Sequence, residues 1–357
     1  MLVSFRVDAS ASIGTGHAMR CLCLADELRG RGAEVHFVCR SLQGDLNAFI
    51  EGKGFPVHIL SGPSADASAD AAETAIALAE VLLAAQKLDW LILDHYGLDA
   101  SWSRKLSASA RRILVIDDLA DRPHFCDCLL DQNLYLRQTG RYEGLLPPGC
   151  VEILGPQFAL LRPEFREARK RRLPHTGIIR KVLLFFGGSD PSNETSKALQ
   201  AMRMLDLPDL EVDVVVGSSN PHRHDVEARC AEMPNTAFHC QVSNMAELMA
   251  KADFSFGAAG SSTWERCCVG LPSAVVVLAD NQELLAHDTH ALGIVLNLGW
   301  VHALEPRDYV QAFRSLTPES IRKMSADGLS TTDGMGAVKV AELLSTQQPE
   351  QVRHAHK

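Results

Sequence analysis

Short apolar runs alternate with stretches of helical periodicity along most of the chain. Val35–Cys39, Trp90–Leu93 and Ile113–Ile116 are predicted strands, and the last two have the continuous apolar character of buried parallel strands and are too short for helices. Between such runs lie helical patterns, including an alanine- and leucine-rich stretch from Ala69 to Lys87. This alternation predicts an α/β protein with a doubly wound parallel sheet.

The second half of the chain repeats this plan. Val182–Phe186 is a predicted buried strand, and a glycine-led loop from Gly187 leads into a helix. We therefore expect two doubly wound, Rossmann-like domains that face each other across a cleft. The predicted boundaries are an N-terminal domain at 1–160, a linker at 161–178, a C-terminal domain at 179–346 and a disordered tail at 347–357.

Composition narrows the class of protein. The 357 residues are 46% hydrophobic and 22% charged, with a formal charge of −9, which is typical of a globular protein and argues against nucleic-acid binding. The one basic run, 166–172, is interpreted as a helix end or linker. No signal-peptide pattern and no bilayer-length apolar segment is visible, so we expect no membrane insertion. Ten cysteines without an export signal favour a reducing cytoplasm, and the absence of a C-x-x-C pair argues against zinc.

The stretch from Phe5 to Arg20 is the first candidate site. A short strand turns through small residues into a helix whose first turn contains His17. Exposed N–H groups and the helix dipole there attract an anion and disfavour the imidazolium, so His17 is a candidate base. A plain strand-to-helix turn with an incidental histidine is the alternative. Asp8 and Asp94, both at predicted strand ends, are candidate partners for its second nitrogen.

Familiar nucleotide motifs are absent. The loop Gly14-Thr15-Gly16 lacks the third glycine of the dinucleotide fingerprint, and neither a P-loop nor an Asp-x-Asp pair occurs. A diphosphate would therefore be held by loop N–H groups and helix termini, for which Gly260-Ser261-Ser262-Thr263 is suited. Glu265, one turn into the following helix, could accept both ribose hydroxyls. These residues could equally be helix caps and a favourable first-turn acid.

Several motifs together resemble one family. They are Asp8-Ala-Ser-Ala-Ser-Ile-Gly-Thr-Gly-His-Ala-Met-Arg20, Leu93-Asp-His-Tyr-Gly-Leu-Asp99, Ile116-Asp-Asp-Leu-Ala120, Leu130-Asp-Gln-Asn133, Phe186-Gly-Gly-Ser-Asp190, Gly260-Ser-Ser-Thr-Trp-Glu265 and Ala279-Asp-Asn-Gln282. In this order they resemble the UDP-2,4-diacetamido-2,4,6-trideoxy-β-L-altropyranose hydrolases (PseG) of pseudaminic acid biosynthesis, over roughly residues 3 to 300. That family is similar to the MurG N-acetylglucosaminyltransferase and shares its glycosyltransferase-B fold.

The resemblance implies that water cleaves the sugar–phosphate bond of a UDP-linked sugar, with inversion at the anomeric carbon and release of UDP. His17 matches the family's proposed general base. UDP would lie mainly on the C-terminal domain, and Tyr96 and Arg162 would line the cleft, although core packing or a hinge salt bridge explains them nearly as well. The remaining residues expected at the substrate are Gly14, Gly16, Arg20, Gly188, Ser189, Asn244, Met245, Gly260, Ser261, Ser262, Thr263, Glu265, Asn281 and Gln282.

Within that set the resemblance implies different contacts. Gly260 to Thr263 would bind the diphosphate and Glu265 the ribose. Asn244 and Met245 belong to the segment 242–245, which would approach the uracil through its backbone, and Asn281 and Gln282 would face the sugar.

We expect a cytoplasmic monomer with no metal or cofactor, whose partners are a UDP-sugar substrate and the UDP product. Two alternatives stay open. One is a MurG-like glycosyltransferase that passes the sugar to an acceptor, and the other is a non-catalytic nucleotide-sugar binding protein. The sequence does not identify the sugar.

Overall fold

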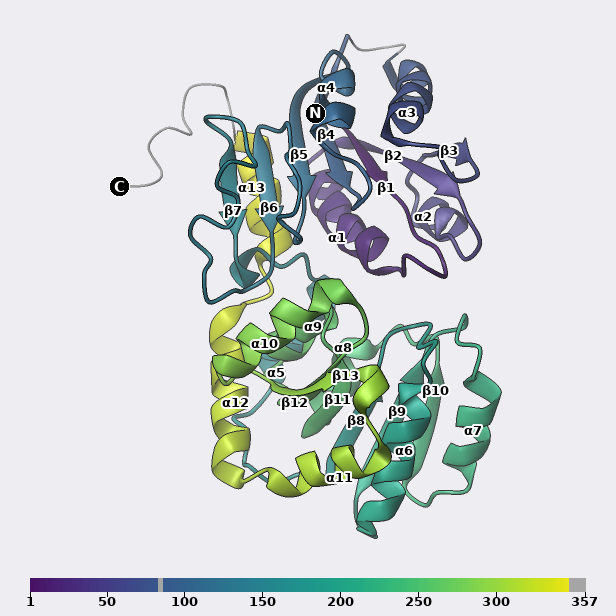
Figure 1. The fold of residues 1–357 in the computed structure, drawn as a ribbon, viewed down its shortest axis with the longest axis vertical. Helices are drawn as coiled ribbons and strands as arrows, with labels where there is room; N and C mark the ends of the chain where they lie inside the picture. Colours follow the sequence, from purple (N-terminus) through teal and green to yellow (C-terminus); the bar gives the residue numbers. More distant parts are fainter. Residues whose placement is uncertain (83–85, 347–357) are drawn as a thin grey trace. The chain divides into compact units, whose positions relative to one another are not determined.

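The chain forms two α/β units, each described here by itself (Figure 1). The computed structural model describes residues 1–82 and 86–346. The first unit comprises residues 1–133, 137–160 and the described residues from Met335 onward, and the second comprises 134–136 and 161–334. Each unit is built on one parallel sheet, which confirms the predicted fold class.

The first unit has a seven-stranded sheet in the order β3-β2-β1-β4-β5-β6-β7, with every neighbouring pair parallel. Its central strands are the apolar runs of the sequence; in register, Phe5 lies opposite Phe37 on one side and Ile92 on the other. The strands are β1 (Leu2–Val7), β2 (Glu34–Ser41), β3 (Val57–Ser61), β4 (Leu88–Asp94), β5 (Ala110–Ile116), β6 (Cys128–Asp131) and β7 (Val151–Leu154).

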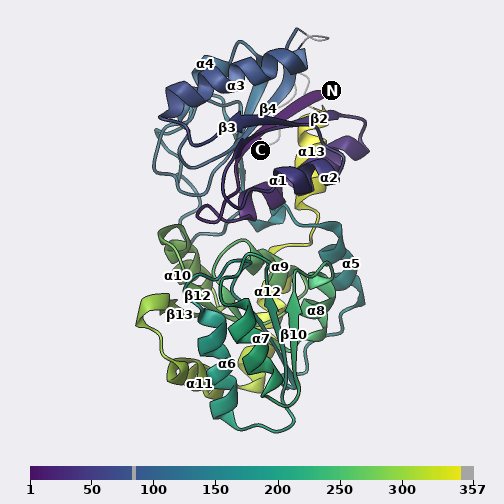
Figure 2. The same cartoon turned by 90° about the vertical axis from the view of Figure 1, so that its right-hand side faces the viewer.

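Helices cover both faces of this sheet (Figure 2). On one face α1 (Gly16–Gly30), α2 (Asn47–Gly52) and α13 (Gly336–Thr346) share a core with β1 and β2. On the other face α3 (Ala67–Val81) and α4 (Ala100–Leu106) pack on β4 and β5. The strands are buried on both sides, which explains their unbroken apolar character.

The second unit has a six-stranded parallel sheet in the order β10-β9-β8-β11-β12-β13. Its strands are β8 (Lys181–Phe185), β9 (Glu211–Val216), β10 (Thr236–Cys240), β11 (Phe254–Ala258), β12 (Ser273–Val277) and β13 (Leu296–Trp300). One core joins these strands to α6 (Glu194–Leu205), α7 (Arg223–Ala231), α11 (Pro306–Ser315) and α12 (Pro318–Thr331). The other helices are α5 (Pro163–Arg171), α8 (Met245–Lys251), α9 (Ser262–Cys268) and α10 (Glu283–Ala291).

Strand order determines where each unit can bind a ligand. In the first sheet, the chain runs outward in opposite directions from β1 and β4, and in the second sheet from β8 and β11. At such a switch point the loops that follow the two strands diverge and leave a crevice at their carboxyl ends. At the switch point of the first unit lie His17, at the start of α1, and Asp94, at the end of β4; at that of the second unit lie the loops with Gly188 and Gly260.

Two predicted domain boundaries are wrong. The segment from Met335 belongs to the first unit and not to the C-terminal domain, because Val340 and Leu344 of α13 are buried against α1 and the first sheet. The predicted linker is not a separate segment either: Phe165 of α5 is buried, and α5 packs on α8 and α9 within the second unit. The basic run lies at the end of α5, as expected of a helix end.

Some predictions fall partly outside the described residues. The helix predicted from Ala69 to Lys87 is observed as α3, and residues 83–85 are not described. The tail predicted to be disordered, 347–357, also lies outside the described residues. Within the part of the chain that is described, no helix combines the length and apolarity needed to cross a bilayer.

Substitution of Leu344 tests whether α13 packs in the core of the first unit. Its side chain is 2% exposed, and its carbonyl accepts a hydrogen bond from the Trp90 indole at 3.0 Å. We expect Leu344→Ala to lower the free energy of unfolding by about 2–5 kcal/mol, because it opens a cavity beside α1. Urea unfolding measures this loss. Glu342→Ala, an exposed change on the same helix, should cost less than about 1 kcal/mol, and equal losses for the two variants would contradict the assignment.

Candidate active site

The loop between β1 and α1 is shaped by short-range hydrogen bonds. Gly14 adopts φ +83°, a conformation that other residues rarely take, and its N–H donates to the Ser10 carbonyl at 2.8 Å. The Ser10 hydroxyl accepts from the N–H of Ile13 at 2.9 Å. The chain then enters α1 at Gly16, and His17 is the second residue of that helix. The predicted first-turn position of His17 is thus confirmed.

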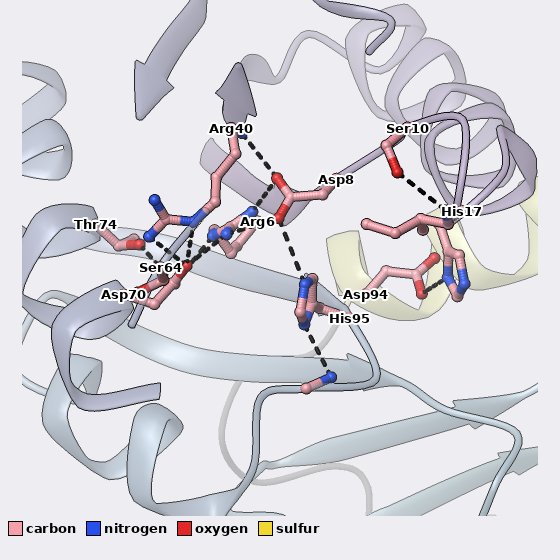
Figure 3. A network of polar contacts seen from close by, with 12 residues as sticks. Arg6, Asp8, Ser10, His17, Arg40, Ser64, Asp70, Thr74, Asp94 and His95 are labelled. Carbon is pink, nitrogen blue, oxygen red and sulfur yellow. Dashed lines mark hydrogen bonds and ion pairs between the residues drawn. The ribbon is translucent and has the colours of Figure 1, made fainter. Parts of the chain in front are cut away.

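The His17 side chain is held by a buried carboxylate at the end of β4. Its Nδ1 lies 2.6 Å from Oδ1 of Asp94, whose side chain is fully buried (Figure 3). Arg20, one turn further along α1, donates to both carboxylate oxygens of Asp94, at 2.6 and 2.7 Å. One carboxylate therefore fixes two side chains of the helix, and Asp94 is the partner of the second nitrogen.

The protonation pattern follows from these contacts. Burial by itself would raise the pKa of Asp94, but the charge of Arg20 and the contact with His17 outweigh it and hold that pKa well below its usual range. Asp94 is thus an acceptor only, and Nδ1 of His17 must be the donor at 2.6 Å. Nη2 of Arg20 lies 3.2 Å from Nδ1, where both groups donate to the same carboxylate. Nε2 is therefore the nitrogen of His17 that is left to face a reactant.

Tyr96 lies beside this pair. Its ring meets the His17 ring edge to face, with centroids 4.6 Å apart. Its hydroxyl donates to Asp118 at 2.6 Å, and Asp118 also lies 3.3 Å from Arg20. Burial and then the charge of Asp118 raise the pKa of Tyr96 well above its ordinary value, which keeps it a phenol. His17, Arg20 and Tyr96 are thus brought together, linked by two carboxylates.

Asp8, the other candidate partner, belongs to a separate network (Figure 3). Its carboxylate accepts from the Arg6 guanidinium at 2.6 and 2.9 Å and from the Arg40 N–H at 2.8 Å. Nε2 of His95 lies 3.4 Å from Oδ2 of the same carboxylate. Asp70 joins Arg6 and Arg40 from α3. Asp8 therefore anchors the end of β1 and does not orient His17.

In the second unit, the loops after β8 and β11 form the corresponding switch point. Gly188 and Ser189 follow β8, where the N–H of Gly217 donates to the Gly188 carbonyl at 2.9 Å. A Cβ at Gly217 would lie only 2.5 Å from that carbonyl, so this approach requires glycine. After β11, Gly260 and Ser261 lead into α9.

The start of α9 is organised around charged side chains. Ser262 is half-buried, but Thr263 is only 1% exposed, and both hydroxyls accept hydrogen bonds from Arg266, at 3.2 and 3.0 Å. Burial raises the pKa of Glu265, and Arg162, 3.5 Å away, partly offsets that effect. The structure places Arg162 in the second unit as the ion-pair partner of Glu265.

The other predicted residues of this unit surround the same edge of the sheet or begin a neighbouring helix. Gln282 lies beside Gly260: a Cβ there would be 3.5 Å from its amide nitrogen, and its amide oxygen accepts from the Leu278 N–H at 3.0 Å. Asn281 precedes it in the same short 3₁₀ turn. Asn244 occupies the position before α8 without a capping hydrogen bond from its side chain, and Met245 is buried, so the Met245 side chain belongs to the core.

Asp118 and Arg266 are the organising residues that the sequence analysis did not select. Asp118 could have been selected from the sequence, because it follows the predicted strand Ile113–Ile116. Arg266 could not have been, because one arginine in a helical pattern is ordinarily exposed. Across residues 1–82 and 86–346, no three His, Cys, Asp or Glu side chains are grouped so as to hold a metal ion.

Known structures show the class of this fold. MurG of Acinetobacter baumannii superposes with a TM-score of 0.67 at 13% identity, covering 97% of this chain and 99% of that one. UDP-GlcNAc 2-epimerase from Neisseria meningitidis gives 0.58 at 13% identity, with 97% and 99% covered. The fold is therefore that of the glycosyltransferase-B proteins, as expected. No protein-family model matches the chain.

Proteins related in sequence indicate the family of the chain more narrowly than the fold does. The UDP-2,4-diacetamido-2,4,6-trideoxy-beta-L-altropyranose hydrolase of Campylobacter jejuni is 30% identical over 292 residues, which are 80% of this chain and 95% of the relative. The spore coat polysaccharide biosynthesis protein SpsG of Bacillus subtilis is 24% identical over 365 residues, covering 99% and 100%. The chain belongs to the family of UDP-2,4-diacetamido-2,4,6-trideoxy-beta-L-altropyranose hydrolases.

A further buried carboxyl group of the first unit is that of Asp131, at the end of β6. This carboxyl is fully buried and accepts from the Asn133 N–H at 3.0 Å and the Tyr142 hydroxyl at 3.0 Å. Burial raises the pKa of Asp131 to about 7; the Asn133 N–H opposes this shift and the charge of Asp118 adds to it. Between its unfolded pKa of 3.8 and about 7, the folded protein keeps a proton that the unfolded chain loses.

Stability relative to Asp131→Asn should therefore fall as the pH rises through this window. The difference in free energy of unfolding should change by up to about 1.4 kcal/mol per pH unit. Urea unfolding of both proteins between pH 4.5 and pH 8 measures it. Curves that stay parallel across this range would contradict the raised pKa.

Proposed function

We propose that this protein hydrolyses a UDP-linked 2,4-diacetamido-2,4,6-trideoxy sugar at its anomeric carbon. Water is the nucleophile, the anomeric centre is inverted, and the products are UDP and the free sugar, which serves pseudaminic acid synthesis. The proposal takes the substrate from the name of the Campylobacter jejuni relative. It includes no metal ion, since the sequence has no Asp-x-Asp pair to hold one.

The observation that supports it most is the contact of 2.6 Å between His17 and Asp94. A base that takes a proton from water needs a fixed tautomer with one nitrogen free as acceptor. Because Asp94 can only accept, it holds the proton on Nδ1 and leaves Nε2 as the base. Arg20 keeps Asp94 ionised, so this arrangement persists through turnover.

In the proposed reaction, Nε2 of His17 takes one proton from a water molecule. The water oxygen forms a bond to the anomeric carbon while the bond from that carbon to the UDP oxygen breaks on the opposite face, which inverts the centre. The electron pair of the broken bond leaves with UDP. The imidazolium that forms is stabilised by Asp94 and later returns its proton to solvent.

UDP departs as an anion, so its negative charge has to be stabilised. We assign this role to Gly260, Ser261 and Ser262 at the edge of the second sheet, with Glu265 at the ribose. The buried side chain of Thr263 supports the loop, and only its backbone would contact the ligand. Gly188 and Ser189 complete this edge from the loop after β8.

A glycosyltransferase is the second candidate, because the fold is shared with MurG. The two functions differ in what accepts the sugar. Incubation of the purified protein with the UDP-sugar alone distinguishes them, since only a hydrolase releases UDP stoichiometrically without an added acceptor.

We expect the wild type to release UDP under these conditions and His17→Ala to lower kcat by about 10²- to 10⁴-fold, which is the usual contribution of a positioned base. UDP affinity should stay close to that of the wild type, because the proposed nucleotide site lies in the other unit. Coupled UDP detection and calorimetry measure the two quantities. Wild-type turnover that His17→Ala leaves intact would refute the assigned base.

Asp94→Asn should lower kcat by about two orders of magnitude. The amide can donate to Nδ1 of His17, which favours a proton on Nε2 and removes the base. Asp8→Asn is the matched control, since Asp8 ends the neighbouring strand without contacting His17; once the variant is shown to be folded, its kcat should stay near that of the wild type. Equal losses in the two variants would indicate a structural effect and not tautomer control.

A further inference from the structure

Arg266 is a buried cation whose direct partners are all uncharged. The residue is 1% exposed and lies in α9. Its guanidinium donates to the Ala258 carbonyl at 2.9 Å, to the Thr263 hydroxyl at 3.0 Å and to the Ser262 and Ser273 hydroxyls, each at 3.2 Å. Among the described residues, no carboxylate lies within ion-pair distance of it; Glu265, its neighbour in sequence, pairs with Arg162 instead.

Burying the charge of Arg266 lowers the free energy of unfolding. A buried ion without a counter-ion is strongly destabilising, and burial lowers the pKa of Arg266 to about 10. The guanidinium is closely packed: a Cβ at Gly257 would lie 2.8 Å from Nη1 of Arg266, and 2.5 Å from the Phe185 carbonyl oxygen of the neighbouring strand. The charge is therefore held by four neutral oxygens in close-packed surroundings and not by a counter-ion.

The hydrogen bonds of Arg266 fix the orientation of two hydroxyl groups at the start of α9. The Ser262 oxygen accepts from the guanidinium, so its own hydrogen points away from Arg266 and is polarised as a donor. Ser262 is half-buried and belongs to the loop that we assign to the diphosphate. The Thr263 hydroxyl is held in the same way but is buried, so it fixes the loop.

We propose that Arg266 is a positioning residue of the nucleotide site, which orients the Ser262 hydroxyl as a donor and supplies the buried positive charge that a nucleoside diphosphate neutralises. This inference rests on the proposed location of UDP. This role explains how the site can favour a diphosphate over an uncharged nucleoside. Arg266 acts through Ser262 and through its charge, without touching the reacting atoms.

The test compares UDP with uridine, which has the same base and ribose but no phosphate. Calorimetry measures UDP affinity and ligand-observed NMR measures uridine affinity, both at one low ionic strength. We expect Arg266→Met to weaken UDP binding by about 10- to 100-fold and to leave uridine binding nearly unchanged. Arg266→Lys keeps the charge and should recover part of the loss. Ser262→Ala should weaken UDP selectively as well, and should add little in the Arg266→Met background.

Arg172→Met is the matched control. Arg172 also donates only to uncharged groups, the carbonyls of Met249, Ala250 and Ala252, but these lie toward the amino end of β11, away from the loop. It should lower stability without changing the ratio of UDP to uridine affinity. An Arg266→Met protein that loses both ligands in proportion, or neither, would overturn the inference.

If Arg266→Met does not fold, Ser262→Ala and Arg266→Lys decide, and unchanged UDP affinity in Ser262→Ala would overturn the inference. A wild type that binds no UDP at all would instead refute the proposed function, and this inference with it.

Discussion

One buried carboxylate organises the candidate active site of the first unit. Asp94 ends β4, has no exposure to solvent, and accepts from two side chains one turn apart on α1. Without Arg20, the burial of Asp94 would favour its protonated form, and its contact with His17 would no longer define a tautomer. Without Asp94, Arg20 would be a buried cation lacking its main partner. The position of His17 therefore depends on this one ion pair.

The two units share a plan of strand order but differ in the buried groups at their switch points. Both place their candidate residues at the switch point of a parallel sheet, where diverging loops leave room for a ligand. In the first unit, buried carboxylates hold a histidine and a tyrosine. In the second, a buried guanidinium without a carboxylate partner supports the loop. The proposed hydrolysis would take its base from the first unit and its anion site from the second.

Much of this architecture could be predicted from the sequence. Strands buried on both faces appear as apolar runs, which is why β2, β4, β5 and β8 were predicted. The strands β6 and β13 were not, because β6 has only two leucines between Cys128 and Asp131 and β13 contains a glycine and an asparagine among its apolar residues. Local sequence patterns do not show which core a helix joins, so the return of the chain to the first unit through α13 was not predicted.

The candidate active site, too, could be predicted from the sequence only in part. Glycine loops, strand-end acids and the histidine are visible as local patterns, and His17 was selected from them. The choice between Asp8 and Asp94 depends on where Arg6, Arg20 and Arg40 lie in space, which spacing along the chain does not reveal. Arg266 was overlooked because its burial, and not its residue type, makes it unusual.

Hydrolysis in ¹⁸O-labelled water tests the central claim most directly. If His17 activates water for attack on the anomeric carbon, mass spectrometry should find the label in the anomeric hydroxyl of the free sugar and none in UDP, and NMR should show the inverted anomer as the first product. Label in the β-phosphate of UDP would mean that water attacks phosphorus, and would contradict the account.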